Sequence, residues 1–112
     1  LRSIAEAYHV VATTLLSLGN TAAPDTKTLI RDLLAQGREM LLRRQISGES
    51  AISRDLFGNG LQLAGHRQLF TGDAPGLLAR REAFQRETTE ILAAIDLLQE
   101  SYDQAWFSKH TH

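Results

Sequence analysis

Apolar side chains recur at steps of three and four residues along almost the whole chain, in four segments separated by short polar joints. Residues with this spacing stack on one face of an α-helix, which repeats about every 3.6 residues. The spacing predicts helices over about residues 1–18, 25–46, 50–70 and 77–102. Amphipathic helices with short joints favour antiparallel neighbours around one core, so we expect an all-α, antiparallel four-helix bundle-like domain over residues 1–105.

The first two joints carry residues that end and begin helices. Gly19 and Asn20 follow the first segment and are suited to a left-handed stop. Pro24 and Asp25 then open the second helix, because Pro is tolerated in a first turn and Asp is favoured near the positive end of the helix dipole. The Ser-Gly pair at positions 47–48 is expected to end that helix.

Three glycines, Gly58, Gly60 and Gly65, fall inside the third segment. Each costs about 1 kcal/mol of helix propensity relative to Ala, or about 3 kcal/mol together. Either a neighbouring helix packs closely against the bare backbone, or the helix breaks at Gly58-Asn59-Gly60. We favour the continuous helix.

The last segment has the longest apolar seam. It has side chains seven residues apart, at Leu77, Phe84, Ile91 and Leu98. A further side chain follows four residues after each of the last three, at Thr88, Ile95 and Tyr102. The composition of residues 71–76 predicts a turn before this helix. Residues 106–112 are expected to form a flexible tail after it.

The composition excludes several classes of protein. Lys and Arg number 12 against 13 Asp and Glu, and the resulting net charge of −1 argues against a nucleic-acid binder. The absence of Cys excludes disulfides, Cys-based zinc sites and thiol catalysis. The best apolar run, residues 10–18, has about half of the roughly 20 residues that a membrane-spanning helix needs.

The sequence contains no arrangement typical of catalysis, cofactor binding or metal binding. His9 and His66 lie on separate predicted helices and the other two histidines lie in the tail, so we expect structural or solvated roles for all four. Asp96, Glu100 and Asp103 share one stretch of helix and are expected to form a solvated acidic end. We therefore predict no catalytic, cofactor-binding or metal-binding residue in this chain.

Arg38, Arg43 and Arg44 form the candidate binding patch, near the end of the second helix. Cations are stabilising there because they complement the negative helix terminus. If the second and fourth helices run parallel, Arg43 and Arg44 lie close to the acidic residues 96–103 in a surface charge network. The alternative is contact with an anion, such as a phosphate or an acidic lipid surface.

Two stretches resemble a known family. Residues 6–11 read Glu-Ala-Tyr-His-Val-Val, and residues 37–47 read Gly-Arg-Glu-Met-Leu-Leu-Arg-Arg-Gln-Ile-Ser, continuing through Glu49-Ser50-Ala51 to Leu61, Ala64 and His66-Arg67. Together they are similar to the C-terminal region of glycerol-3-phosphate acyltransferases of the PlsB type, over roughly residues 1–70. Members of that family transfer an acyl group from acyl-CoA or acyl carrier protein to the first hydroxyl of glycerol 3-phosphate at a membrane surface.

The two catalytic motifs of that family, His-x4-Asp and Glu-Gly-Thr-Arg, do not occur here. Thr14 stands where Asp would have to follow His9, and Asp73 lies too far beyond His66. The resemblance therefore implies a C-terminal helical domain of an O-acyltransferase in phospholipid biosynthesis, inactive alone and needing no cofactor. Its implied partner is the catalytic acyltransferase domain of the same polypeptide, with a membrane surface as a further partner. The implied location is peripheral, at the cytoplasmic face of a bacterial membrane.

Two other functions remain as alternatives. One is a free-standing helical adaptor that binds a partner helix in an apolar groove. The other is a helix-turn-helix DNA binder that uses the joint at residues 47–53, which the net charge disfavours.

Overall fold

The computed structural model describes residues 1–71 and 74–110, which form four α-helices and one short 3₁₀ helix. In chain order these are α1 (Arg2–Ser17), α2 (Thr26–Leu42), the 3₁₀ helix η1 (Glu49–Ala51), α3 (Arg54–His66) and α4 (Ala74–His110). The described residues include no strand. The prediction of an all-α, bundle-like domain is confirmed.

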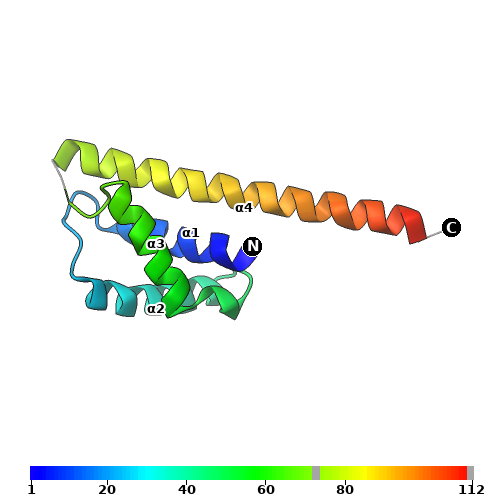
Figure 1. The fold of residues 1–112 in the computed structure, drawn as a ribbon, viewed down its shortest axis with the longest axis horizontal. Coiled ribbons are helices and arrows are strands. Elements are labelled where there is room, and N and C mark those ends of the chain that lie inside the picture. Colours follow the sequence, from blue (N-terminus) through cyan, green and yellow to red (C-terminus); the bar gives the residue numbers. More distant parts are fainter. Residues whose placement is uncertain (72–73, 111–112) are drawn as a thin grey trace.

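α1 is the central helix of the domain. It lies between α4 on one side and α2 on the other, while α3 crosses the layer they form (Figure 1). The side chains that meet around α1 are fully or almost fully buried, and they include Val10, Val11, Leu15, Leu33, Met40 and Phe57. α4 runs antiparallel to α1, so the seam predicted for the last helix meets α1 along its first half (Figure 1).

The second half of α4 projects beyond the other helices (Figure 1). The projection makes the molecule 60 Å long but only 25 and 23 Å across, and its radius of gyration is 16.0 Å, against about 13 Å for a compact domain of this size. Our prediction of a flexible tail at 106–112 is wrong up to His110, which is helical. There the His110 ring stacks on Trp106 at 4.1 Å, and its Nδ1 lies 2.7 Å from the Trp106 carbonyl. Residues 111–112 lie outside the described residues.

The joint between α1 and α2 has the predicted geometry. Gly19 adopts φ +61°, the left-handed conformation expected of a stop. Asp25 caps α2, accepting hydrogen bonds from the Thr28 backbone N–H at 3.1 Å and the Thr28 hydroxyl at 2.7 Å. These two bonds lower the pKa of the Asp25 carboxyl because they favour its charged form.

α2 ends at Leu42, four residues before the predicted end. Arg44 adopts φ +60° and the Gln45 N–H donates to the Met40 carbonyl at 2.8 Å, which is the hydrogen bonding of a Schellman stop. Glycine is the usual residue at that left-handed position, and here it is arginine, so composition gave no stop signal. α3 ends in the same way, with Gln68 at φ +57°.

α3 is shorter than the predicted helix but is continuous through its glycines. η1 occupies the beginning of the predicted segment, and Ser53 caps α3 by accepting from the Leu56 N–H at 3.3 Å. At Gly60 a Cβ atom would lie 2.9 Å from Val11 Cγ2, so the bare backbone lets α3 approach α1 closely. Close packing, the alternative that we favoured over a break, is therefore confirmed at Gly60.

α4 begins at Ala74, three residues before the predicted start. Pro75 is compatible with this boundary, because the first turn of a helix does not use the backbone N–H that proline lacks. Of the predicted turn at 71–76, residues 72–73 lie outside the described residues. Residues 74–76 are helical.

Candidate functional site

Arg81 of α4 is fully buried and makes no ion pair within the described residues. Its guanidinium instead donates to four backbone carbonyls, at 2.7–3.3 Å. Two of these, on Gly19 and Thr21, belong to the joint between α1 and α2. The other two, on Leu69 and Phe70, belong to the segment after α3. Burial lowers the pKa of Arg81, and the positive charge of Arg80 adds to this effect, but an arginine remains charged.

The hydrogen bonds of Arg81 fix the direction in which α4 leaves the domain. They tie the first part of α4 to the two loops at the same end of the bundle, next to the buried Leu77. Arg81 was not predicted from the seam, although it lies four residues after Leu77, where the heptad pattern favours an apolar residue. A charged residue at a core position was the available signal.

Glu6 of α1 is a second buried charged residue, only 4% exposed. Its carboxylate accepts from the Ser47 backbone N–H at 2.7 Å and from the Ser47 hydroxyl at 3.3 Å. It thereby fixes the joint between α2 and η1 against α1.

His9 lies between α1 and α4, with Nδ1 2.8 Å from the Thr88 hydroxyl oxygen. The Thr88 hydroxyl donates its hydrogen to the Gln85 carbonyl at 2.9 Å, so it accepts from His9 Nδ1–H. Burial lowers the pKa of His9, and the negative charge of Glu6 opposes that shift only in part. His9 thus has a structural role, one of the two roles, structural or solvated, that were expected for the histidines.

The contribution of His9 to stability should therefore rise with pH in a window around and below 6.5, the ordinary pKa of its imidazole. A lowered pKa in the folded state means that the unfolded chain binds more protons in this window. Protonation of His9 then favours unfolding. A single group changes the free energy of unfolding by at most about 1.4 kcal/mol per pH unit. Urea unfolding at several pH values would measure the slope, which His9→Asn should reduce. The exposed His66→Asn is the control and should leave the slope unchanged; an equal change in both variants would exclude His9 as its source.

The structure separates the three residues of the candidate basic patch. Arg43 pairs with Glu39 on its own helix at 2.8 Å, and Arg44 lies exposed after the helix. The prediction that Arg43 and Arg44 face the acidic end of α4 is wrong, because α1 separates α2 from α4 (Figure 1). Asp96 instead pairs with Arg2 of α1 at 2.5 Å.

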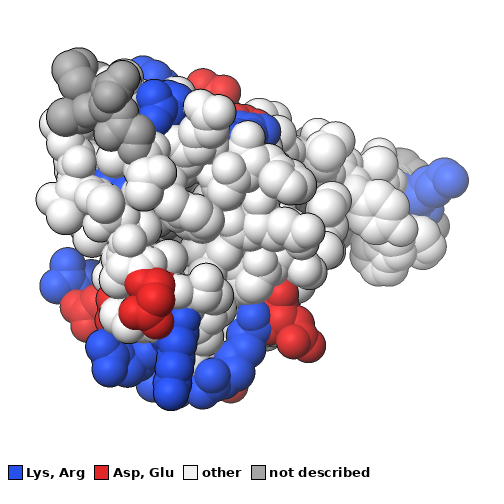
Figure 2. All heavy atoms as spheres, turned by 60° about the vertical axis from the view of Figure 1, so that its left-hand side comes forward, with Lys and Arg blue, Asp and Glu red and all other residues white. Residues whose placement is uncertain are grey.

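Arg38 belongs to a different surface, which we name the basic stripe: Lys27, Arg31 and Arg38 of α2 together with Arg54 of α3. The three α2 residues follow helical steps on the side opposite its buried Leu33 and Met40. Lys and Arg side chains gather along this edge of the molecule (Figure 2). Within the described part of the chain, no carboxylate lies within ion-pair distance of Lys27, Arg38 or Arg54.

Apolar side chains accompany the basic stripe. Leu42, 81% exposed, lies one turn beyond Arg38, and the half-buried Leu34 lies between Arg31 and Arg38. Hollows in the surface border the stripe near Arg31 and near Arg38. Lys27, Arg31 and Arg54 were not among the predicted site residues, because they are close to Arg38 on the folded surface and not in the sequence.

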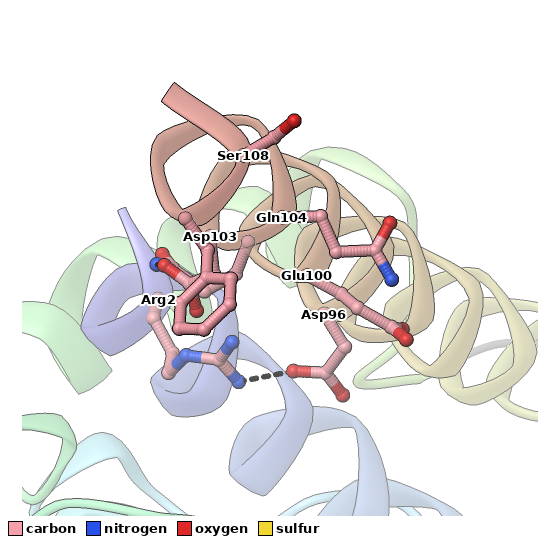
Figure 3. A pocket seen from close by; sticks show the side chains of 8 residues that line it. Arg2, Asp96, Glu100, Asp103, Gln104 and Ser108 are labelled. Carbon is pink, nitrogen blue, oxygen red and sulfur yellow. Dashed lines mark hydrogen bonds and ion pairs between the residues drawn. The ribbon is translucent and has the colours of Figure 1, made fainter. Parts of the chain in front are cut away.

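The projecting half of α4 carries the second candidate surface. It has an exposed apolar face, which we name the α4 seam and which consists of Ile91, Ile95, Leu98, Tyr102 and Trp106. Leu98 and Tyr102 are both 68% exposed. Asp96 and Asp103 lie toward one edge of this face, and Glu100 lies on the opposite side of the helix. All three border a shallow groove that Arg2 also lines (Figure 3). The acidic residues are solvated, as expected.

No group of three or more His, Cys, Asp or Glu side chains placed to hold a metal ion is found in residues 1–71 and 74–110. Among the helices described, none has the length and apolar character needed to cross a membrane.

Comparison with known proteins identifies the family. The model of the glycerol-3-phosphate acyltransferase C-terminal region matches residues 1–73. Proteins of Mycobacterium bovis and Mycobacterium tuberculosis, each named "Putative acyltransferase plsB1", are 31% identical over 101 residues, which cover 89% of this chain. The aligned residues span only 16% of each relative's length. No solved structure gives a significant match. The chain belongs to the family of the C-terminal region of glycerol-3-phosphate acyltransferases.

Proposed function

We propose that this chain is the C-terminal supporting domain of a glycerol-3-phosphate acyltransferase, with the catalytic acyltransferase domain on another part of the same polypeptide. The family match over residues 1–73 carries this proposal. The reaction is transfer of an acyl group from acyl-CoA or acyl carrier protein to glycerol 3-phosphate. The helical domain binds the catalytic domain and stabilises it, and it is inactive alone.

The projecting half of α4 supports this role. Its seam leaves Leu98, Tyr102 and Trp106 exposed on one helix, an amount of aligned apolar surface typical of an interaction site. Arg81 and the core around Leu77 fix the base of the helix, so the projection has a defined direction relative to the domain. A projecting helix that is fixed at its base can position a second domain.

Deletion of this region from the full polypeptide tests the proposal. Acyl transfer to glycerol 3-phosphate should fall at least about tenfold, with a lower melting temperature for the remainder, because the catalytic domain loses its support. The purified 112-residue chain should transfer no acyl group. Full activity and unchanged stability after the deletion would contradict the proposal.

A peripheral position on an anionic membrane is a second proposed role, and the basic stripe supports it. Lys and Arg close to an anionic membrane each contribute about 1 kcal/mol to binding. Leu34 and Leu42 place apolar side chains beside those cations, a combination typical of helices that lie at a membrane interface. The basic stripe replaces Arg43 and Arg44 as the proposed membrane contact, while Arg38 is retained.

Vesicle sedimentation tests this role on the 112-residue chain. Binding is expected to vesicles of 70% phosphatidylcholine and 30% phosphatidylglycerol, but not to phosphatidylcholine alone. The double substitution Arg31→Gln with Arg38→Gln should weaken binding by about 2 kcal/mol, or roughly 30-fold. Arg86→Gln, on the exposed side of α4, is the matched control. Equal binding to both vesicle types would rule out the basic stripe as a headgroup contact.

A further inference from the structure

α1 and α4 pack as an antiparallel pair, but α4 is much longer. α1 begins at Arg2, opposite the middle of α4, and the rest of α4 continues past that point with no described helix beside it (Figure 1). The face of α4 that meets α1 therefore extends beyond the first residues of α1.

The α4 seam is a direct continuation of the buried face. Within the pair, Leu77, Phe84 and Thr88 are at most 3% exposed. The next seam residue, Ile91, is 44% exposed, and Leu98 is 68% exposed. The steps of three and four residues do not change along the helix, so the exposed seam residues lie on the same face as the buried ones.

The uncovered face begins at an apolar pocket between the two helices. Leu1 and Ile4 of α1 line it together with Phe84 and Ile91 of α4. Leu1 is 86% exposed and Ile4 44%, so this end of α1 also presents apolar surface in the direction of the seam.

We propose that the polypeptide segment directly preceding Leu1 continues α1 as a helix and packs antiparallel along the α4 seam. This inference rests on the proposed function, because it requires the longer polypeptide of the acyltransferase. From Ile95 to Trp106 the seam is about 17 Å long, at 1.5 Å per residue. A continuation of α1 by about 12–15 residues covers it. The covering helix connects this domain to the rest of the enzyme.

Charges on the edge of the seam specify this occupant further. Arg2 of α1 pairs with Asp96, and Asp103 lies two turns further along the same edge of α4 (Figure 3). In an antiparallel pair, the residue about two turns before Arg2 lies beside Asp103. The covering segment should therefore carry Lys or Arg at about that position.

A second copy of this chain is a poorer occupant. Residues 91–108 of α4 contain three carboxylates and no Lys or Arg. Two such helices packed against each other would bring acidic residues together without a cation to pair with them, and like charges at such an interface are unfavourable.

Hydrogen–deuterium exchange on the intact polypeptide tests this proposal. Amides of residues 95–106 should exchange at least about tenfold more slowly there than in the 112-residue chain, because a packed helix opens less often than an exposed one. Leu98→Glu should restore fast exchange both in residues 95–106 and in the roughly 15 residues before Leu1. Leu97→Glu is the matched control, since Leu97 is 64% exposed but lies off the seam, and it should change neither.

Three outcomes would overturn the proposal. Residues 95–106 could exchange equally fast in both proteins. They could be protected in the intact polypeptide while Leu98→Glu affects a segment other than the one before Leu1. Protection that rises with concentration in the 112-residue chain would identify a second copy as the occupant. Acyl transfer after deletion of the whole region tests the proposed function separately, so the two can fail independently.

Discussion

Replacement of Arg81 with Met should lower the free energy of unfolding by about 3–5 kcal/mol. Arg81 donates to four carbonyls from two loops while its side chain is fully buried. Methionine fills similar space but donates no hydrogen bond, so the carbonyls of Gly19, Thr21, Leu69 and Phe70 lose their charged donor. Each buried carbonyl left without a partner costs about 1–3 kcal/mol, reduced where water can enter.

Urea unfolding followed by circular dichroism measures this effect. Arg81→Lys should have an intermediate effect, because an ammonium group keeps the charge but lacks the planar fork that reaches both loops. Arg86→Met is the matched control, since Arg86 is exposed on the same helix, and it should change stability by no more than about 0.5 kcal/mol. A loss below 1 kcal/mol for Arg81→Met would show that Arg81 does not hold the loops together.

The same substitution at two glycines of α3 should give opposite results. Gly60→Ala should destabilise the chain by about 1–2 kcal/mol, because the new Cβ would lie 2.9 Å from Val11 Cγ2 and 3.3 Å from Tyr8 Cδ1. Val11 is fully buried and branched at Cβ, so it has little room to move. Gly58→Ala should stabilise the chain by about 1 kcal/mol, because no atom lies within 4 Å of its Cβ position and Ala favours helix.

Thermal and urea unfolding of the two variants measure the difference of about 2–3 kcal/mol between them. Both positions lie in one helix, two residues apart, so the gain in helix propensity from alanine is the same at each. Packing against α1 differs, because only the Cβ atom at position 60 would meet it. Equal effects at Gly58 and Gly60 would contradict the close approach of α3 to α1.

The helical pattern and the local stops were predictable from the sequence because they depend on neighbouring residues. Asp25 caps α2 through its own side chain, and Gly19 takes the conformation that glycine favours. The ends of α2 and α3 were not predictable in this way. At Arg44 and Gln68, residues without a preference for positive φ adopt it because the tertiary fold requires the turn.

The candidate surfaces required the three-dimensional arrangement. Arg38 joins Lys27 and Arg31 because they share a helix face, whereas Arg43 lies on another side and pairs with Glu39. The seam of the last helix was visible in the sequence, but its division into a buried half and an exposed half depends on which residues of α4 lie beside α1. Periodicity along α4 does not contain that information.

Complementation in trans tests most directly whether this chain supports a separate catalytic domain. The polypeptide lacking this region is expected to show little acyl transfer to glycerol 3-phosphate alone. Addition of the purified 112-residue chain should raise its activity to saturation, and the same chain carrying Arg81→Met should do so less well. Full activity of the truncated polypeptide without the added chain would contradict the account.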